Sequence, residues 1–143
     1  MTTEAATEET RRRSGIDLEI FFGALADRTR LRLLNLMRGG EICVCYFVEG
    51  MRAPQPTISR HLAHLRRAGL VNARRDGKWM HYSIAEPADA GMRTILRDTL
   101  ARLAGDPEMA RDRERIVRAC CSPRTPITLE GAPRPRGFQE GGE

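Results

Sequence analysis

A change of hydrophobic period at Gly69 constrains the fold of this chain more than any other feature of its 143 residues. Over residues 56–67 the apolar side chains recur at steps of three and four, which predicts a helix with one apolar face. The residues of that face are Ile58, Leu62 and Leu65. Over residues 70–84 polar and apolar residues alternate on both sides of Asp76-Gly77, and an Asp-Gly pair supplies the positive φ angles of a tight two-residue turn. This part of the chain therefore predicts a helix that runs directly into a β-hairpin.

Further helices are predicted around this pair. Apolar residues at helical spacing mark residues 16–26, a segment from Asp27-Arg28-Thr29 to Gly39-Gly40, residues 88–104, and a segment from Asp106 to about Cys120. Asp27 or Thr29 is expected to cap the second of these helices. The apolar stripe on the 88–104 helix is longer than one small domain needs, so this helix and the 16–26 helix are assigned to a dimer interface. Together the elements predict a mainly α, homodimeric winged helix-turn-helix fold.

The expected domain organisation places a winged helix-turn-helix domain, for DNA binding and dimerisation, at residues 16–105. Residues 1–15 are polar, lack an apolar stretch of signal-peptide length, and are expected to form a disordered N-terminal tail. Residues 106–122 form a C-terminal helix with a cysteine pair, and the Pro- and Gly-rich residues 123–143 are expected to be disordered. No apolar run approaches the length of a membrane span, so we expect a cytoplasmic protein with no membrane partner.

The basic residues gather in the middle of the chain. The net charge is +5, and residues 52–82 hold seven Arg and Lys residues against the single acid Asp76, so the remainder carries a net charge of −1. Those seven are Arg52, Arg60, Arg66, Arg67, Arg74, Arg75 and Lys78. A surplus confined to one segment indicates that a polyanion docks on one face of the domain, and the alternative is a solvated basic surface.

The four cysteines form two tight pairs, Cys43-Val44-Cys45 and Cys120-Cys121. In the cytoplasm, closely spaced cysteines more often bind metal or take part in redox chemistry than cross-link a fold. Thiolates favour soft ions, and a trivalent arsenic or antimony centre binds three of them. The alternative for Cys43 and Cys45 is that they are small apolar core residues.

Three segments, in this order, resemble the ArsR/SmtB family of metal-responsive winged-helix repressors: ALADRTRLRLLNLMRGGEICVCYF, QPTISRHLAHLRRAGLV and RRDGKWMHYSIAEP. The resemblance covers about residues 16–86. It implies a homodimer that binds a two-fold symmetric operator in double-stranded DNA and releases it when an inducer binds. The CVC placement resembles the arsenic-responsive branch, whose inducer cysteines lie in the helix before the recognition helix.

The same resemblance identifies Gln55 to Arg67 as the recognition helix and the hairpin as the wing. The candidates for contacts to bases or phosphates on this helix are Gln55, Thr57, Ser59, Arg60, His61 and His64. Short hydroxyl and amide side chains at a helix N-terminus can reach base edges, and guanidinium groups hold phosphates or guanine. On the wing, the side chains expected to reach the DNA backbone or the minor groove are Arg74, Arg75 and Lys78.

Two departures from the family pattern bear on the inducer. The arsenic branch commonly has cysteines spaced C-x-C-x-x-C, and the third position here is Val48. A second family site uses Asp and His on the long C-terminal dimer helix, but residues 88–104 contain no His, which excludes that site. The third thiolate must then come from Cys120, from Cys121 or from a non-protein thiol. Consecutive helical side chains diverge by about 100°, so one of the pair is expected to dominate, with Cys120 preferred.

The spacing of Cys43 and Cys45 also predicts how an inducer would act. In an ideal helix these side chains point about 200° apart, whereas two sulfurs bound to one ion lie within roughly 4.6 Å of each other. Binding is therefore expected to distort the first turn of that helix, which packs on the recognition helix.

We therefore expect a repressor of the arsenical-resistance type that binds operator DNA as a dimer, is released by arsenite or antimonite, and has no catalytic cofactor. The alternative is a redox- or persulfide-sensing winged-helix repressor in which the same thiol pairs oxidise. An enzyme is not expected: no cysteine is followed six positions later by Arg, as a phosphatase-like reductase loop requires, and no Gly-rich nucleotide motif is present. Arsenite, antimonite, organic arsenicals, cadmium and lead are all compatible with two thiol pairs.

Overall fold

The computed structural model describes residues 17–121, 129, 131–135 and 138 of the chain, without the side chain of Cys121. Its elements, in chain order, are α2 (Leu18–Leu25), α3 (Arg28–Leu36), β1 (Ile42–Cys43), α4 (Val44–Met51), α5 (Gln55–Arg67), β2 (Val71–Asp76), β3 (Trp79–Ile84), α6 (Ala90–Leu103) and α7 (Pro107–Cys121). The predicted N-terminal tail lies outside the described residues, as does most of the 123–143 segment, so the disorder expected for both stays a prediction.

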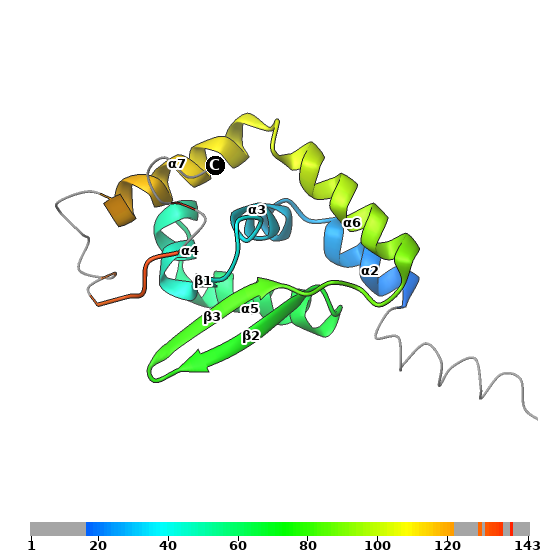
Figure 1. Cartoon of the computed structure of the whole chain (residues 1–143), viewed down its shortest axis with the longest axis horizontal. Coiled ribbons are helices and arrows are strands. Elements are labelled where there is room, and N and C mark those ends of the chain that lie inside the picture. The colour runs from blue at the N-terminus through cyan, green and yellow to red at the C-terminus, as the bar shows by residue number, and fades with distance from the viewer. Residues whose placement is uncertain (1–16, 122–128, 130, 136–137, 139–143) are drawn as a thin grey trace, which may run out of the picture.

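A small sheet lies along one side of the molecule, below most of the helices in the view of Figure 1. α5 packs against β2, and α3 and α4 pack against α5. α7 crosses over α3 and α4, while α2 and α6 lie toward the same end of the molecule (Figure 1). A helix pair followed by a β-hairpin confirms the predicted winged helix-turn-helix architecture.

The sheet has three antiparallel strands in the order β1-β3-β2, so the wing is joined to a short strand that precedes α4. Within it, Cys43 of β1 pairs with His81 of β3, and His81 pairs on its other side with Arg74 of β2. Residues paired across antiparallel strands point to the same face of a sheet. One row of side chains therefore connects the first cysteine to the wing.

The hairpin turn differs from the predicted one by a residue. Asp76 pairs with Trp79 at the end of the ladder, so the two turn residues are Gly77 and Lys78. Gly77 has φ +61, and no other residue of the turn has a positive φ. A turn with glycine at its first central position needs only that one positive φ, which is why Asp76 can remain in β2.

Aspartate side chains begin several of the helices. Asp27 accepts a hydrogen bond from the N–H of Arg30 at 3.0 Å, which confirms it, rather than Thr29, as the cap of α3. Asp17 and Asp89 cap α2 and α6 in the same way. A capping carboxylate satisfies a backbone donor that has no partner within the helix, so these helices begin where the aspartates stand.

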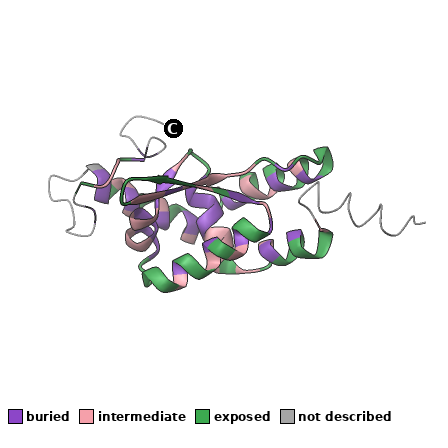
Figure 2. Cartoon of the chain, turned by 90° about the horizontal axis from the view of Figure 1, so that it is seen from below, coloured by how far each residue is buried: buried purple, intermediate pink, exposed green. Residues whose placement is uncertain are grey.

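The core is shared by α3, α4, α5 and α7, and Figure 2 shows the buried residues gathered in the centre of the molecule. Gly50 lies where α4 crosses α7: a Cβ atom built there would be 2.7 Å from Cγ1 of Ile116. Leu129 and Phe138, which lie in the segment expected to be disordered, are both buried in this core.

Large apolar side chains remain exposed on α2 and α6. They are Leu18 (57% exposed), Ile20 (52%), Phe22 (48%) and Ile95 (37%). These are the two helices that the sequence assigned to a dimer interface. Among the described helices, none has the length and apolar character needed to cross a bilayer.

Candidate DNA interface and cysteine site

The predicted recognition helix is α5, with the bounds expected from the sequence. Pro54 occupies its N-cap position without a capping side-chain hydrogen bond, and Pro56 lies in its first turn, where a backbone N–H would have no helical partner. Its buried side chains are Ile58, Leu62 and Leu65. Of its predicted DNA-contact residues, Gln55, Ser59 and Arg60 are exposed, and Thr57, His61 and His64 are half-buried.

His61 of α5 sits beside the first turn of α3. Nδ1 of His61 lies 3.3 Å from Nη1 of Arg30 and 3.8 Å from Oδ2 of Asp27. One turn further along, burial and then the positive charge of Arg30 lower the pKa of His64. The lowered pKa favours the neutral form of the His64 imidazole, whereas Arg60, Arg66 and Arg67 carry a permanent positive charge on this helix.

The three wing cations are exposed but differ in their contacts. Arg74 makes a two-pronged ion pair with Glu41, with Nε to Oε2 at 2.9 Å and Nη2 to Oε1 at 2.7 Å. Nζ of Lys78 lies 4.9 Å from the centre of the Trp79 ring. Among the described residues, Arg75 forms no salt bridge. Arg75 and Lys78 are thus available to a polyanion as they stand, whereas Arg74 must first leave Glu41.

The first thiol pair is preassembled at the junction of β1 and α4. Sγ of Cys43 lies 3.1 Å from Sγ of Cys45. The Cys45 thiol donates to Cys43, and the N–H groups of Cys45, Val44 and Met80 add to this, so the pKa of Cys43 falls to about 7. The same interaction raises the pKa of Cys45, because its proton is held between the two sulfurs.

This geometry corrects the expectation that the two side chains diverge. Cys43 is not helical: it is the last residue of β1 and the N-cap of α4, with φ −73 and ψ 143. An extended residue followed by the first helical turn brings the sulfurs to the same side, whereas two helical residues would separate them. Binding one ion through both sulfurs therefore does not require α4 to unwind.

The third described cysteine lies on α7, which packs against α4. Cys120 on α7 is 2% exposed, and its Sγ approaches the backbone oxygens of Val117 at 3.7 Å and Phe138 at 3.6 Å. Burial first, then the charges of Cys120 and Cys45, raise the pKa of Tyr46 to about 12. Within the described residues no three Cys, His, Asp or Glu side chains already stand in a metal-ligand arrangement.

A cavity of about 600 Å³ opens beside the thiol pair. It is lined by the row of paired sheet residues and by the described C-terminal residues: Gly39, Gly40, Glu41, Cys43, Arg74, Asp76, His81, Pro133, Arg134 and Pro135. His81 of β3 is 5% exposed and is the cross-strand partner of Cys43.

A buried carboxylate that the sequence analysis missed anchors α7. Asp112 is fully buried and binds Arg32 of α3 at 2.8 and 2.9 Å and Arg115 at 2.7 Å. Arg115 also donates to the carbonyl oxygen of Gly50 at 2.7 Å, near the end of α4. The sequence could have indicated this, because Asp112 lies at helical spacing between the apolar residues Met109 and Ile116 and therefore falls on the buried face of the helix. Asp112, Arg32 and Arg115 therefore join α7 to α3 and to the end of α4, the helix that precedes α5.

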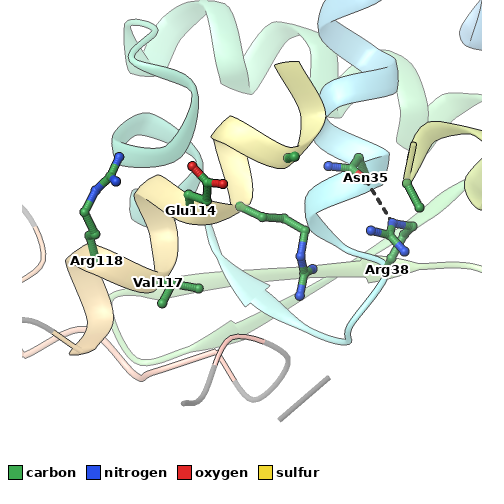
Figure 3. A pocket seen from close by; sticks show the side chains of 8 residues that line it. Asn35, Arg38, Glu114, Val117 and Arg118 are labelled. Carbon is green, nitrogen blue, oxygen red and sulfur yellow. Dashed lines mark hydrogen bonds between the residues drawn. The ribbon is translucent and has the colours of Figure 1, made fainter. Parts of the chain in front are cut away.

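A second hollow, of about 530 Å³, lies between α3, the end of α6 and α7 (Figure 3). Nε of Arg38 donates to Oδ1 of Asn35 at 2.9 Å there. Burial, then the charge of Arg38, lowers the pKa of Arg113, whose guanidinium lies 4.4 Å from the Phe138 ring. The described lining contains neither Cys nor His, so it offers no ligands for a soft ion.

Comparison with known proteins agrees with this architecture. Residues 27–73 match the family described as "Bacterial regulatory protein, arsR family". A probable mercury resistance operon repressor of Streptomyces lividans is 40% identical over 114 residues, which are 80% of each chain. The arsenic resistance transcriptional regulator ArsR1 of Pseudomonas putida is 48% identical over 66 residues, which are 46% of this chain and 52% of that one. The chain thus spans about half the length of this arsenic regulator.

Among solved structures, HlyU from Vibrio cholerae shares the fold with a TM-score of 0.52 and 23% identity. The alignment covers 73% of this chain and all of that one. It supports the arrangement of helices and wing and nothing finer.

Proposed function

Because this chain belongs to the arsR family of bacterial DNA-binding transcriptional regulators, we propose that it is a repressor that binds operator DNA as a homodimer and is released by trivalent arsenic or antimony on its cysteine thiolates. The family membership also confirms that the chain is not an enzyme. Relatives named for arsenic and for mercury both match it, so its own cysteines, and not its family, distinguish between inducers.

The main support for an inducer bound by thiolates is the 3.1 Å separation of the Cys43 and Cys45 Sγ atoms. Two sulfurs on one ion lie within roughly 4.6 Å of each other, so this pair needs no rearrangement beyond a small opening. The lowered pKa of Cys43 supplies a thiolate near neutral pH, and the thiolate is the form that binds a soft ion. The sulfur separation and the lowered pKa of Cys43 together suit the binding of a trivalent metalloid by this thiol pair.

The third sulfur is proposed to come from α7. A trivalent ion with three thiolates is neutral, which favours its burial, whereas two thiolates would leave it a positive charge. Cys120 is buried on α7, and α7 packs against α4, the helix that carries Cys45. Cys121 follows it directly in the chain and is the other candidate.

The homodimer is proposed through α2 and α6. Their exposed side chains Leu18, Ile20, Phe22 and Ile95 form the apolar surface that a second copy would cover. Large apolar side chains grouped on neighbouring elements of a small protein mark an interaction surface. Two copies joined there would present two α5 helices and two wings to a symmetric operator.

The proposed release signal runs through the sheet. Cys43 ends β1, β1 pairs with β3, and β3 pairs with β2, which carries Arg74 and Arg75. An ion that draws Cys43 toward α7 would shift β1 and with it the wing. Because the thiols are already together, this route replaces the helix distortion expected from the sequence.

A redox-sensing repressor is the second candidate, and the same sulfur separation favours it. Two thiols 3.1 Å apart can form an S–S bond when an oxidant such as a peroxide accepts two electrons and two protons from them. Parallel titrations of the operator complex with arsenite and with hydrogen peroxide separate the two candidates.

The deciding experiment measures operator release from the full-length reduced protein by arsenite. Cys43→Ser and Cys45→Ser are expected to abolish release, and either Cys120→Ser or Cys121→Ser is expected to weaken it. Full response in the double 120/121 variant would reduce the site to two thiols and refute the three-thiolate proposal. Release by peroxide but not by arsenite would favour the redox function.

A further inference from the structure

The imidazole of His81 is buried with one of its nitrogens unused. His81 is 5% exposed, and its Nε2 has no hydrogen-bond partner. Its Nδ1 lies 3.9 Å from Oε1 of Glu41, which is beyond hydrogen-bond distance. Buried polar atoms are nearly always satisfied, so an unsatisfied one in a native core calls for an explanation, such as an absent ligand.

The position of His81 beside two thiols indicates what kind of ligand its unused nitrogen would bind. It is the direct partner of Cys43 across the β1–β3 ladder, and both residues line the 600 Å³ cavity. Directly opposed residues have Cβ atoms about 5 Å apart and share a face of the sheet. An imidazole therefore stands beside a thiol that already touches a second thiol, Cys45.

We propose that His81 is a metal ligand and that Cys43, Cys45 and His81 form a two-sulfur, one-nitrogen site for a divalent cation of the zinc group, Zn²⁺ or Cd²⁺. This inference rests on the proposed ion-binding role of the two thiols, and it adds a residue that neither the sequence nor the comparisons assigned to an ion. Thiolate and neutral imidazole are the ligands that these cations prefer.

Charge balance separates this site from the proposed metalloid site. A divalent cation with two thiolates and a neutral imidazole has no net charge, as does a trivalent ion with three thiolates. A trivalent ion on the histidine set would keep one positive charge in a buried place, which is unfavourable. The same thiol pair would therefore take its third ligand from β3 for a divalent cation and from α7 for a metalloid.

Binding requires small movements and releases protons. No three ligands already stand in position in the described part of the chain, so the imidazole must turn about its side-chain bonds toward the sulfurs. The cavity beside it provides space for that turn. The cation replaces the two thiol protons, which pass to solvent, and the imidazole binds through an unprotonated nitrogen.

The test uses the full-length reduced protein and Cd²⁺ as the probe. Cadmium binding is followed by the thiolate-to-metal absorption, and the imidazole is followed by ¹⁵N NMR of the wild-type protein. We expect the His81 nitrogen signal to shift on Cd²⁺ addition. We also expect His81→Gln to lose at least the roughly 10–100-fold in affinity that even outer-shell partners of a metal contribute.

Matched variants keep the result specific. His64→Gln, which changes a histidine of α5 remote in sequence from any thiol, is expected to leave Cd²⁺ affinity unchanged, as is Cys120→Ser. Arsenite binding by His81→Gln should equal that of the wild type, which also shows that the variant is folded. If arsenite does not bind the wild type but Cd²⁺ binding needs His81, the proposed inducer is wrong and the histidine site stands.

Two outcomes overturn the inference. One is an unchanged Cd²⁺ affinity in a folded His81→Gln variant. The other is an imidazole ¹⁵N spectrum of the wild type that Cd²⁺ does not alter, and this measurement holds even if the variant fails to fold.

Discussion

The DNA-facing side and the cysteine site of this protein are built in opposite ways. The candidate base contacts lie within one helix of 13 residues whose buried face is set by three apolar positions. The cysteine site draws on β1, α4 and β3, and an ion pair between Arg32 and Asp112 joins α3 to α7, the helix of Cys120. A local element tolerates change at its surface, whereas a site assembled from distant segments is sensitive to the packing that holds them. Mutations should therefore separate the two regions.

The largest effect is expected from Asp112→Ala. It leaves the guanidinium groups of Arg32 and Arg115, both mostly buried, without their carboxylate. Breaking a buried pair on one side destabilises a protein by about 3–5 kcal/mol. Urea unfolding measures this loss, with the exposed Asp98→Ala on α6 as control, expected to change stability by no more than about 0.5 kcal/mol. Equal midpoints for the two variants would mean that the cluster does not hold α7.

Gly50→Ala comes next, because the added methyl group would sit 2.7 Å from Cγ1 of Ile116. Overpacking of this kind costs about 1–3 kcal/mol, and it should push α7 away from α4. Thermal unfolding measures the effect, and the double variant Gly50→Ala/Ile116→Ala should lose less stability than the two single changes added together. Simple additivity of the single changes would show that the two helices do not meet there. Operator contacts on α5 should be unaffected in the folded protein.

On the DNA-facing side, changes should alter binding and leave stability alone. Arg75→Ala is expected to make the slope of log affinity against log salt shallower by about 0.9 for the lost phosphate contact. Arg74→Ala should have a smaller effect, because Glu41 already holds this arginine, and Glu41→Gln should strengthen operator binding by freeing it. A salt titration of operator binding measures all three. If Glu41→Gln weakens binding, Arg74 serves the sheet and not the DNA.

The smallest expected effect is a pH dependence at the start of α7. Hydrogen bonds from Arg28 lower the pKa values of Asp106 and Glu108 below their ordinary range. The stabilisation is therefore present above the pKa values of the unfolded chain and is lost as the pH falls through the lower folded values. Arg28→Ala should be slightly less stable than the wild type at pH 7, and the difference should shrink steadily as the pH falls through the lowered pKa values of the two carboxyls. A difference that persists in acid would assign the role of Arg28 to packing.

Local patterns explain what could be predicted. The bounds of α5, the Asp27 cap and the hairpin follow from apolar spacing, a capping carboxylate and a glycine, all of which act within a few residues. The turn was misplaced by one residue because Asp76 and Gly77 both suit such turns, and only the pairing of Asp76 with Trp79 decides between them. The basic segment was visible, but the engagement of Arg74 by Glu41, 33 residues away, was not.

The sequence by itself determined the winged helix-turn-helix, the buried face of its recognition helix and the presence of two thiol pairs, because period, capping and composition are properties of neighbouring residues. Only the tertiary structure decided that Cys43 ends a strand and meets Cys45 at 3.1 Å, that His81 is buried opposite it, and that Asp112 binds α7 to α3. The physical reason is that a strand of two residues has no periodicity to detect. It forms because β3 supplies its hydrogen-bond partners, and β3 lies nearly forty residues further along the chain.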